Sequence, residues 1–248
     1  MMLFSSAHAV IQQVLALTLV LLLPVWDYYE TRKLKENAAL KLPYYRQAIA
    51  VLWILAAIAA WATNMRVFVV HRSAAGIPWL LGSPTTKVIA GILLTLFFAA
   101  ALLPGIRGAR SSKTRQAYVR EYRRALAFFL PDTAKDIRWF SVLCVSAGIC
   151  EEILFRGFLM PYLHRGPWLL SWTLALVVTS IGFGLNHLYQ GPSGVFSTAL
   201  AGLAFGIVFL LTGNLILPIL LHIAVDLQVV LVLRPADATA SPLRRAKR

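Results

Sequence analysis

Acidic side chains are scarce in this 248-residue sequence, which holds 10 Asp and Glu against 24 Lys and Arg. Charged residues of both signs make up only 14% of the chain, whereas 59% of it is hydrophobic and its mean hydropathy is +0.71. Soluble globular proteins are only about 45–50% apolar. The composition therefore indicates a polytopic membrane protein, and the lack of any long polar region excludes a second, soluble domain.

Several motifs are also missing. The sequence has no HExxH pattern, so a zinc hydrolase has no specific support, and no serine sits in a recognisable nucleophile elbow. No nucleic-acid-binding motif accompanies the net charge of +14. We therefore expect no nucleic-acid partner, and we interpret the positive charge as loops that face anionic lipid in the cytoplasmic leaflet.

Cysteine occurs only as Cys144 and Cys150, both within one apolar stretch. Six residues of helix rise about 9 Å, which is too far for an unstrained disulfide between them. We therefore expect no disulfide between these two residues.

Seven apolar stretches are long enough to predict transmembrane helices. They are Ala9–Val25, Gln47–Thr63, Lys87–Ile106, Trp139–Leu159, Trp168–Leu188, Val195–Leu211 and Leu215–Leu233. A further amphipathic helix, Ala117–Leu130, is expected on the membrane surface. We predict an all-α integral membrane bundle with about seven transmembrane helices and a central polar cavity. It occupies residues 1–233, and a basic, disordered tail follows at 234–248. An extra helix within 64–86 would change the count.

The basic residues indicate how the bundle is oriented. With the N-terminus outside, 19 of the 24 Lys and Arg fall on one face, in the first loop, the 107–138 stretch and the tail. Because cytoplasmic loops are enriched in Lys and Arg, we expect this face and the C-terminus to be cytoplasmic. The expected location is the bacterial inner (plasma) membrane.

Two adjacent carboxylates, Glu151 and Glu152, interrupt the apolar stretch Trp139–Leu159. A carboxylate at mid-bilayer costs about 2.5–3.5 kcal/mol, so such a pair marks a site. Arg156 follows Glu152 by four residues, which predicts an ion pair on one helical face. Glu151 points about 100° away and lacks that partner. We interpret Glu152 as structural and Glu151 as the reactive group; the alternative is that the charges only lock helices together.

The later apolar stretches contribute few other ionisable groups. Phe183 and His187 are four residues apart, as are His222 and Asp226, so each pair shares a helical face. Unpaired polar groups in lipid are costly, so we expect these side chains and Glu151 to converge on one polar cavity.

Two reactions fit such a cavity. In the first, Glu151 is a general base for water, His187 helps to hold that water, and His222 with Asp226 stabilises an oxyanion at a peptide carbonyl. In the second, the same Glu, His, His and Asp side chains hold a zinc ion that activates the water.

The three patterns together carry a resemblance. Glu-Glu-x-x-x-Arg, Phe-x-x-x-His and His-x-x-x-Asp resemble, in order, gaps and helix placement, the motifs of the CAAX prenyl protease and bacteriocin-processing (CPBP, or Abi) family, which includes the Rce1-like intramembrane glutamic endopeptidases. The resemblance extends from Trp139 to Leu233, so 139–233 would be the catalytic core. Residues before Arg138 add only their membrane character.

The resemblance implies an endopeptidase that hydrolyses a peptide bond near the C-terminus of a membrane-associated protein or peptide, without a metal or other cofactor. It implies catalytic roles for Glu151, His187, His222 and the position of Asp226, with support from Glu152, Arg156 and Phe183. One residue departs from the pattern: the family usually has Asn where this chain has Asp226. An ionised Asp cannot donate a hydrogen bond, so Asp226 is either protonated or orients His222.

Three rival interpretations remain. The same residues could form a proton relay in a transporter, although no inverted repeat is visible in the sequence. The chain could instead be a bacteriocin immunity protein that binds a peptide toxin. Among enzymes, the rival is the zinc-dependent intramembrane protease.

Overall fold

The computed structural model describes residues 2–68 and 82–233, and every regular element within these residues is a helix. The predicted all-α class is therefore confirmed. The predicted disordered tail, 234–248, lies outside the described residues. So does most of the connector in which an extra helix was considered, since 69–81 are not described.

The helices follow one another in a simple order. They are α1 (Met2–Leu17), α2 (Leu23–Glu36), α3 (Lys41–Ala62), α5 (Pro84–Arg110), α6 (Ser112–Leu126), α7 (Ala134–Glu152), α8 (Met160–Arg165), α9 (Trp172–Leu185), α10 (Gly191–Thr212) and α11 (Ile216–Val232). Two π-helical segments, η1 (Thr18–Leu22) and η5 (Ile153–Leu159), join α1 to α2 and α7 to α8 without a break. Short 3₁₀ turns occur at η2 (Ala38–Leu40), η3 (Arg66–Phe68) and η6 (Leu188–Gln190).

Four helices in the described part of the chain are long and apolar enough to cross a membrane. They span Ala7–Glu36, Ala38–Ala62, Pro84–Arg110 and Leu188–Thr212. Two further apolar helices, α9 and α11, have 14 and 17 residues. The predicted span Trp139–Leu159 lies within the continuous α7–η5–α8 helix, whose apolar part carries three charged side chains. An integral membrane protein is thus indicated by four spans, and the other three remain predictions.

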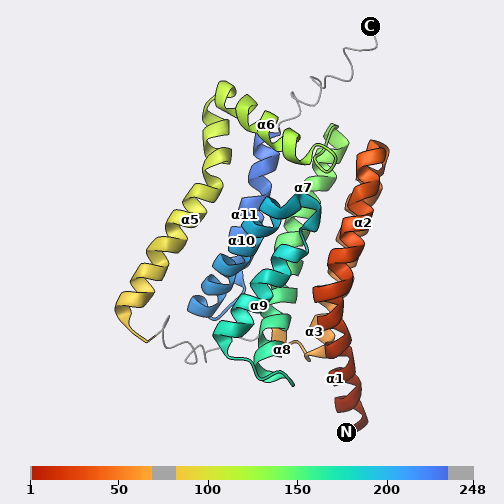
Figure 1. The fold of residues 1–248 in the computed structure, drawn as a ribbon, viewed down its shortest axis with the longest axis vertical. Coiled ribbons are helices and arrows are strands. Elements are labelled where there is room, and N and C mark those ends of the chain that lie inside the picture. The colour runs from red at the N-terminus through yellow and green to blue at the C-terminus, as the bar shows by residue number, and fades with distance from the viewer. Residues whose placement is uncertain (1, 69–81, 234–248) are drawn as a thin grey trace.

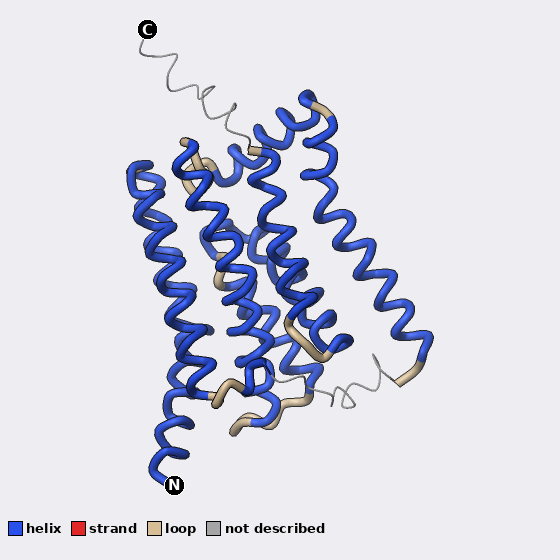
Figure 2. The backbone as a smooth tube through the Cα atoms, turned by 180° about the vertical axis from the view of Figure 1, so that it is seen from behind, coloured by secondary structure: helices blue, strands red, loops and turns tan. Residues whose placement is uncertain are grey.

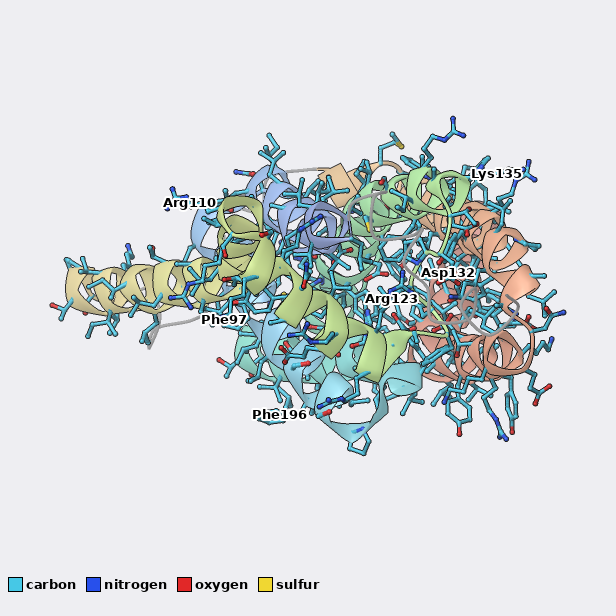
Figure 3. All side chains as sticks on the ribbon, turned by 90° about the horizontal axis from the view of Figure 1, so that it is seen from above. Phe97, Arg110, Arg123, Asp132, Lys135 and Phe196 are labelled. Atoms are coloured by element: carbon cyan, nitrogen blue, oxygen red, sulfur yellow. The ribbon has the colours of Figure 1, made fainter. Side chains whose placement is uncertain are left out.

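Most of the long helices run roughly parallel, and α6 crosses over one end of the bundle (Figure 1). Seen from behind, α5 leans away from the other helices (Figure 2). Viewed from above, it projects beyond the bundle, while α6 covers the end where Arg110, Arg123 and Lys135 lie (Figure 3). The predicted surface helix 117–130 corresponds to α6, which begins earlier, at Ser112, and ends at Leu126.

Two prolines were read from the sequence as chain breaks: Gly191-Pro192 as a turn, and Pro161 as the end of the span Trp139–Leu159. Gly191, with φ +77°, does lie at the turn between η6 and α10, and Pro192 follows it in the first turn of α10. Proline is tolerated in that first turn because its missing N–H would have no intrahelical partner there. Pro161 does not end its helix, which continues through α8 to Arg165.

Pro104 lies inside α5, and a side chain from α11 fills the gap that it leaves. Gln228 accepts a hydrogen bond from the backbone N–H of Gly105 at 3.1 Å and donates one to the carbonyl of Ala101 at 2.5 Å. The approach needs glycine, because a Cβ on Gly105 would lie 2.8 Å from the Cβ of Gln228. One amide therefore bridges the backbone of α5 beside the proline and fastens α5 to α11.

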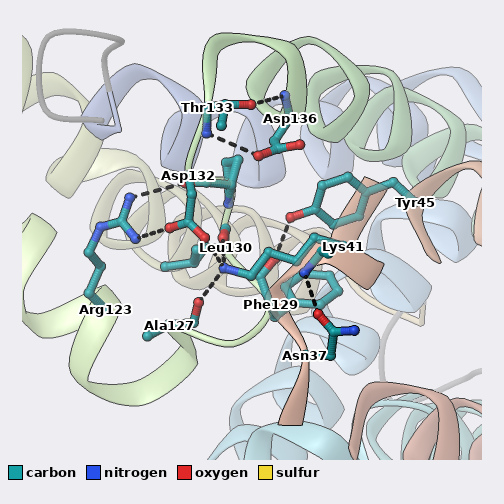
Figure 4. A network of polar contacts seen from close by, with 12 residues as sticks. Asn37, Lys41, Tyr45, Arg123, Ala127, Phe129, Leu130, Asp132, Thr133 and Asp136 are labelled. Atoms are coloured by element: carbon teal, nitrogen blue, oxygen red, sulfur yellow. Dashed lines mark hydrogen bonds and ion pairs between the residues drawn. The ribbon is translucent and has the colours of Figure 1, made fainter. Parts of the chain in front are cut away.

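A buried lysine organises the end of the bundle beneath α6 (Figure 4). The ammonium of Lys41 donates to the carbonyls of Ala127 and Leu130, both at 2.7 Å, and to Asp132 at 2.5 Å. Arg123 binds the other oxygen of Asp132 at 2.8 Å. These bonds satisfy carbonyls that the end of α6 leaves without helical partners. Immediately after them, Thr133 and Asp136 form a capping box that starts α7.

Replacing Gln228 by Met should destabilise the protein by about 2–4 kcal/mol, because the N–H of Gly105 and the carbonyl of Ala101 lose their partner in an apolar setting. In a Pro104→Ala background the same replacement should cost much less, since a regular helix can pair these two groups itself. Thermal unfolding of the four purified proteins measures both costs. An equal cost in both backgrounds would contradict the bridging role.

Candidate active site

One carboxylate oxygen lies at the centre of the candidate site. Oε1 of Glu152 accepts hydrogen bonds from Arg156 at 2.8 Å and from Nδ1 of His222 at 2.9 Å. Glu152 is fully buried and Arg156 is 1% exposed. The two charges pair across one turn between α7 and η5, as the four-residue spacing predicted, and the imidazole comes from α11.

Arg156 also ties this pair to two other helices. Its second guanidinium nitrogen donates to the carbonyl of Gly202 in α10 at 2.7 Å. Its guanidinium carbon lies 4.7 Å from the ring centroid of Phe183 in α9 and 5.5 Å from that of Phe205 in α10. Aromatic faces of this kind stabilise a buried cation. The ion pair thus contacts α9, α10 and α11 at once.

His222 is held in a defined orientation. Its ring stacks on Phe205, with centroids 4.8 Å apart and an interplanar angle of 18°. Because a carboxylate only accepts hydrogen bonds, the Nδ1 that faces Glu152 carries the hydrogen. Nε2 then faces Glu151 at 4.0 Å and Asp226 at 3.7 Å. Both distances exceed a hydrogen bond, so Nε2 is available to a third group placed between these carboxylates.

A glycine allows α7 and α11 to meet at this point. A Cβ on Gly148 would lie 2.5 Å from Cγ1 of Ile223 and 3.0 Å from the backbone nitrogen of the same residue. Any side chain would therefore push the two helices apart. Gly148 is one turn before Glu152, and Ile223 follows His222. This close crossing therefore brings Glu152 and His222 within hydrogen-bond distance of each other.

His187 lies just after α9, beside the helix end formed by Asn186. Its Nδ1 is 2.9 Å from the carbonyl of Phe183, so Nδ1 carries the hydrogen and Nε2 of the neutral ring can only accept one. The ring of Phe183 lies between the two imidazoles, with centroid distances of 5.1 Å to His187 and 5.7 Å to His222.

Glu151, His187, His222 and Asp226 all line one pocket of about 460 Å³. Its wall is otherwise largely apolar and aromatic, with contributions from α2, α3, α6, α7, α9, α10 and α11. The structure therefore brings together the four residues that the sequence proposed as catalytic. Glu152 and Arg156 lie outside the lining, behind His222 and Phe183.

Two acceptor atoms of the pocket residues are buried and have no hydrogen-bond partner among the described residues: Oε2 of Glu151 and Oδ1 of Asn186. The amide of Asn186 is oriented by its nitrogen, which donates to the carbonyls of Leu19 at 3.0 Å and Gly182 at 2.8 Å. A buried acceptor without a partner is costly in an apolar setting, which indicates that a donor binds here during function.

The arrangement of the side chains bears on the zinc alternative. Within residues 2–68 and 82–233, no group of three or more His, Cys, Asp or Glu side chains is placed so that it could hold a metal ion. Cys144 and Cys150 are both buried free thiols.

Sequence reasoning missed several residues of this pocket. Asp27 of α2 lines it and accepts a hydrogen bond from the hydroxyl of Tyr44 in α3. Tyr189 and Gln190 line it as well, and the amide of Gln190 donates to the hydroxyl of Tyr189 at 3.1 Å. In the sequence, Asp27 falls within an aromatic segment typical of a membrane interface. A charged residue is common at such an interface, so the pattern does not predict a pocket residue there.

Comparison with known proteins identifies part of the chain. Residues 133–228 match the family model described as type II CAAX prenyl endopeptidase Rce1-like. No curated protein and no solved structure matches the chain significantly. The matched segment runs from the capping box of α7 to the glutamine that fastens α5, and it includes every residue that was proposed for the site. Over residues 133–228, this chain is therefore similar to the Rce1-like type II CAAX prenyl endopeptidase family.

Proposed function

We propose that this protein is an intramembrane endopeptidase in which Glu151 activates a water molecule for attack on a peptide bond. The observation that carries the proposal is the convergence of Glu151, His187, His222 and Asp226 on one pocket, within a segment of an endopeptidase family. An intramembrane protease is the activity that the family suggests; the mechanism and the substrate below are our inference.

In the first step, the carboxylate of Glu151 takes a proton from water as the water oxygen bonds to the carbonyl carbon of the substrate. Its Oε2, which has no partner among the described residues, is the atom we assign to this proton. His187 lines the same pocket, and its free Nε2 can accept the second hydrogen of the water. The electron pair of the carbonyl moves to its oxygen, which becomes an oxyanion.

In the second step, His222 stabilises that oxyanion. When the ring is protonated, Nε2–H can donate to the oxyanion, while Nδ1–H stays bonded to Glu152. Asp226, 3.7 Å from Nε2, favours the protonated ring as a nearby negative charge. This is the role we propose for an aspartate where the family usually has asparagine. Glu151 then returns its proton to the amide nitrogen, the C–N bond breaks, and a carboxylic acid and an amine leave.

The membrane arrangement completes the proposal. We propose seven transmembrane helices, with the C-terminus in the cytoplasm of a bacterial cell, and with the pocket as the central cavity. Its substrate is a membrane-associated protein or peptide that is cut near the C-terminus. The basic end that carries α6 contacts anionic lipid, because each Lys or Arg near such a surface is attracted by about 1 kcal/mol.

Glu151→Gln should abolish peptide hydrolysis and leave the protein folded, because glutamine keeps the shape of the side chain and loses the base. The loss should reach at least about 100-fold. Release of fluorescence from a library of quenched peptides measures cleavage by the purified protein in lipid nanodiscs, and thermal unfolding measures stability.

The matched control is Glu121→Gln, on the exposed side of α6, which should cleave like the wild type. Cleavage by Glu151→Gln at the wild-type rate would rule out the mechanism. A wild-type protein that cuts no peptide in the library would favour the immunity or transport interpretations.

Arg156→Ala should destabilise the protein by about 3–5 kcal/mol, because it leaves the buried carboxylate of Glu152 uncompensated. The double variant Glu152→Gln/Arg156→Met, which removes both charges, should fold better than Arg156→Ala. Arg124→Ala, at an exposed position of α6, is the control and should have little effect. Yield of monodisperse protein and thermal unfolding report these differences. An active, stable Arg156→Ala protein would contradict this role.

Hydrolysis should continue after exhaustive dialysis against a strong chelator, and elemental analysis of the active protein should find less than stoichiometric zinc. The expectation follows from a water-activating glutamate that needs no metal. A protein treated with the chelator and then resupplied with zinc serves as the comparison. Activity that disappears on dialysis and returns only with zinc would transfer Glu151, His187 and His222 to the role of metal ligands.

A further inference from the structure

Asn186 lines the pocket directly before His187, yet the hydrolysis proposed above gives it no role. Among the described residues that line the pocket, two buried acceptor atoms have no hydrogen-bond partner: Oε2 of Glu151 and Oδ1 of Asn186. Oε2 of Glu151 takes a proton from water in the proposed mechanism. Oδ1 of Asn186 still needs a donor, because a buried amide oxygen without a hydrogen bond carries the full cost of its desolvation.

The carboxamide of Asn186 has one defined orientation. Its nitrogen donates to the carbonyl of Gly182 at 2.8 Å and to the carbonyl of Leu19 at 3.0 Å. Both partners only accept hydrogen bonds, so the reversed amide would place its oxygen against two carbonyl oxygens. Because both amide hydrogens are already used, the oxygen is the atom of this group that remains for a ligand.

Two different helical segments hold this amide in place. Gly182 belongs to α9, and its carbonyl also accepts the backbone N–H of Asn186 at 3.1 Å, where the helix ends. Leu19 is fully buried in η1, the π-helical segment of the N-terminal helix, and such segments frequently occur at functional sites. An acceptor that is fixed from two sides is preorganised, which reduces the entropy lost when a ligand binds to it.

A peptide in this pocket supplies the donor that Asn186 lacks. Each residue of a peptide except proline carries a backbone N–H, and burying that group without an acceptor is costly. The pocket wall is largely apolar and aromatic, so an N–H that enters it loses its contact with water. The attacking water is not the donor, since its two hydrogens go to Glu151 and to Nε2 of His187 in the proposed mechanism.

We propose that Asn186 is a substrate-binding residue, and that its Oδ1 accepts a hydrogen bond from one backbone N–H of the peptide near the scissile bond. The inference rests on the proposed function, because it names a further contact of the same site. Since Asn186 is adjacent to His187, this bond fixes which peptide carbonyl lies beside the water held by Glu151 and His187. Main-chain recognition of this kind sets the register of a peptide and leaves its side chains to other parts of the pocket.

Methylation of single backbone nitrogens in a peptide tests the proposal. The probe is a fluorescent copy of the library peptide that binds most tightly to the Glu151→Gln protein, which should bind peptides without cutting them. Further copies each carry one N-methyl group in place of one N–H. Fluorescence anisotropy in lipid nanodiscs gives the dissociation constants. We expect methylation at one position to weaken binding at least about tenfold, because Oδ1 of Asn186 loses its donor.

Two substitutions, each added to the Glu151→Gln protein, separate the acceptor from the anchor. Asn186→Leu and Asn186→Asp both lose the nitrogen that binds Leu19 and Gly182, but only Asn186→Asp keeps an acceptor oxygen. At the sensitive position, the penalty for methylation should fall at least about tenfold in Asn186→Leu and remain in Asn186→Asp. A merely structural role predicts the same change in both. Ser197→Ala removes a pocket hydroxyl that already donates to the carbonyl of Gly194, and it should leave every penalty unchanged.

The result also separates this inference from the proposed function. Undetectable binding of every peptide, the absence of a sensitive position, a penalty that persists in Asn186→Leu, or one that disappears equally in both variants would each overturn the inference. Should Asn186→Leu fail to fold, Asn186→Ala lacks the same acceptor and makes the same comparison. A protein that shows the expected pattern, but whose wild type cuts no peptide, would refute the hydrolase and keep the inference. A wild type that cuts peptides without this pattern would do the reverse.

Discussion

The candidate site depends on one oxygen atom, Oε1 of Glu152, which accepts from Arg156 and from His222 at the same time. A buried ion pair contributes little net stability, because removing two charges from water costs about as much as their attraction returns. Its value here is geometric. The guanidinium also holds the carbonyl of Gly202, so α7, α10 and α11 can pack in only one register if all these donors are to be satisfied. That packing fixes the orientation of the His222 imidazole.

Around this oxygen, the buried supporting residues are separated from the residues that line the pocket. Glu152 is inaccessible, whereas its neighbour Glu151 reaches the pocket, and the helical turn of about 100° between adjacent residues produces the difference. Phe183 and Phe205 lie between the two sets of groups, since both contact the guanidinium on one side and the ring of His222 on the other. Apolar walls keep the few polar groups of the site in fixed positions.

Sequence reasoning succeeded where an interaction stays within one helix. The spacing of Glu152 and Arg156 predicted their ion pair, and hydropathy predicted helices throughout the described chain. It failed where partners come from distant helices: the glutamate that binds His222 is 70 residues away from it, and no periodicity encodes that contact. Asp27 was overlooked for the same reason, since only the packing of α2 against the bundle shows that it faces the pocket. Pro161 misled because the helix continues through it to Arg165.

The amide bridge at Pro104 bears on how the protein is made. Gly105 is synthesised 123 residues before Gln228, the side chain that receives its N–H. Without α11, the N–H of Gly105 and the carbonyl of Ala101 lack the partner that they have in the folded protein, and such a group costs several kcal/mol in hydrocarbon. The stability of α5 in lipid is therefore coupled to α11, the last helix of the described chain.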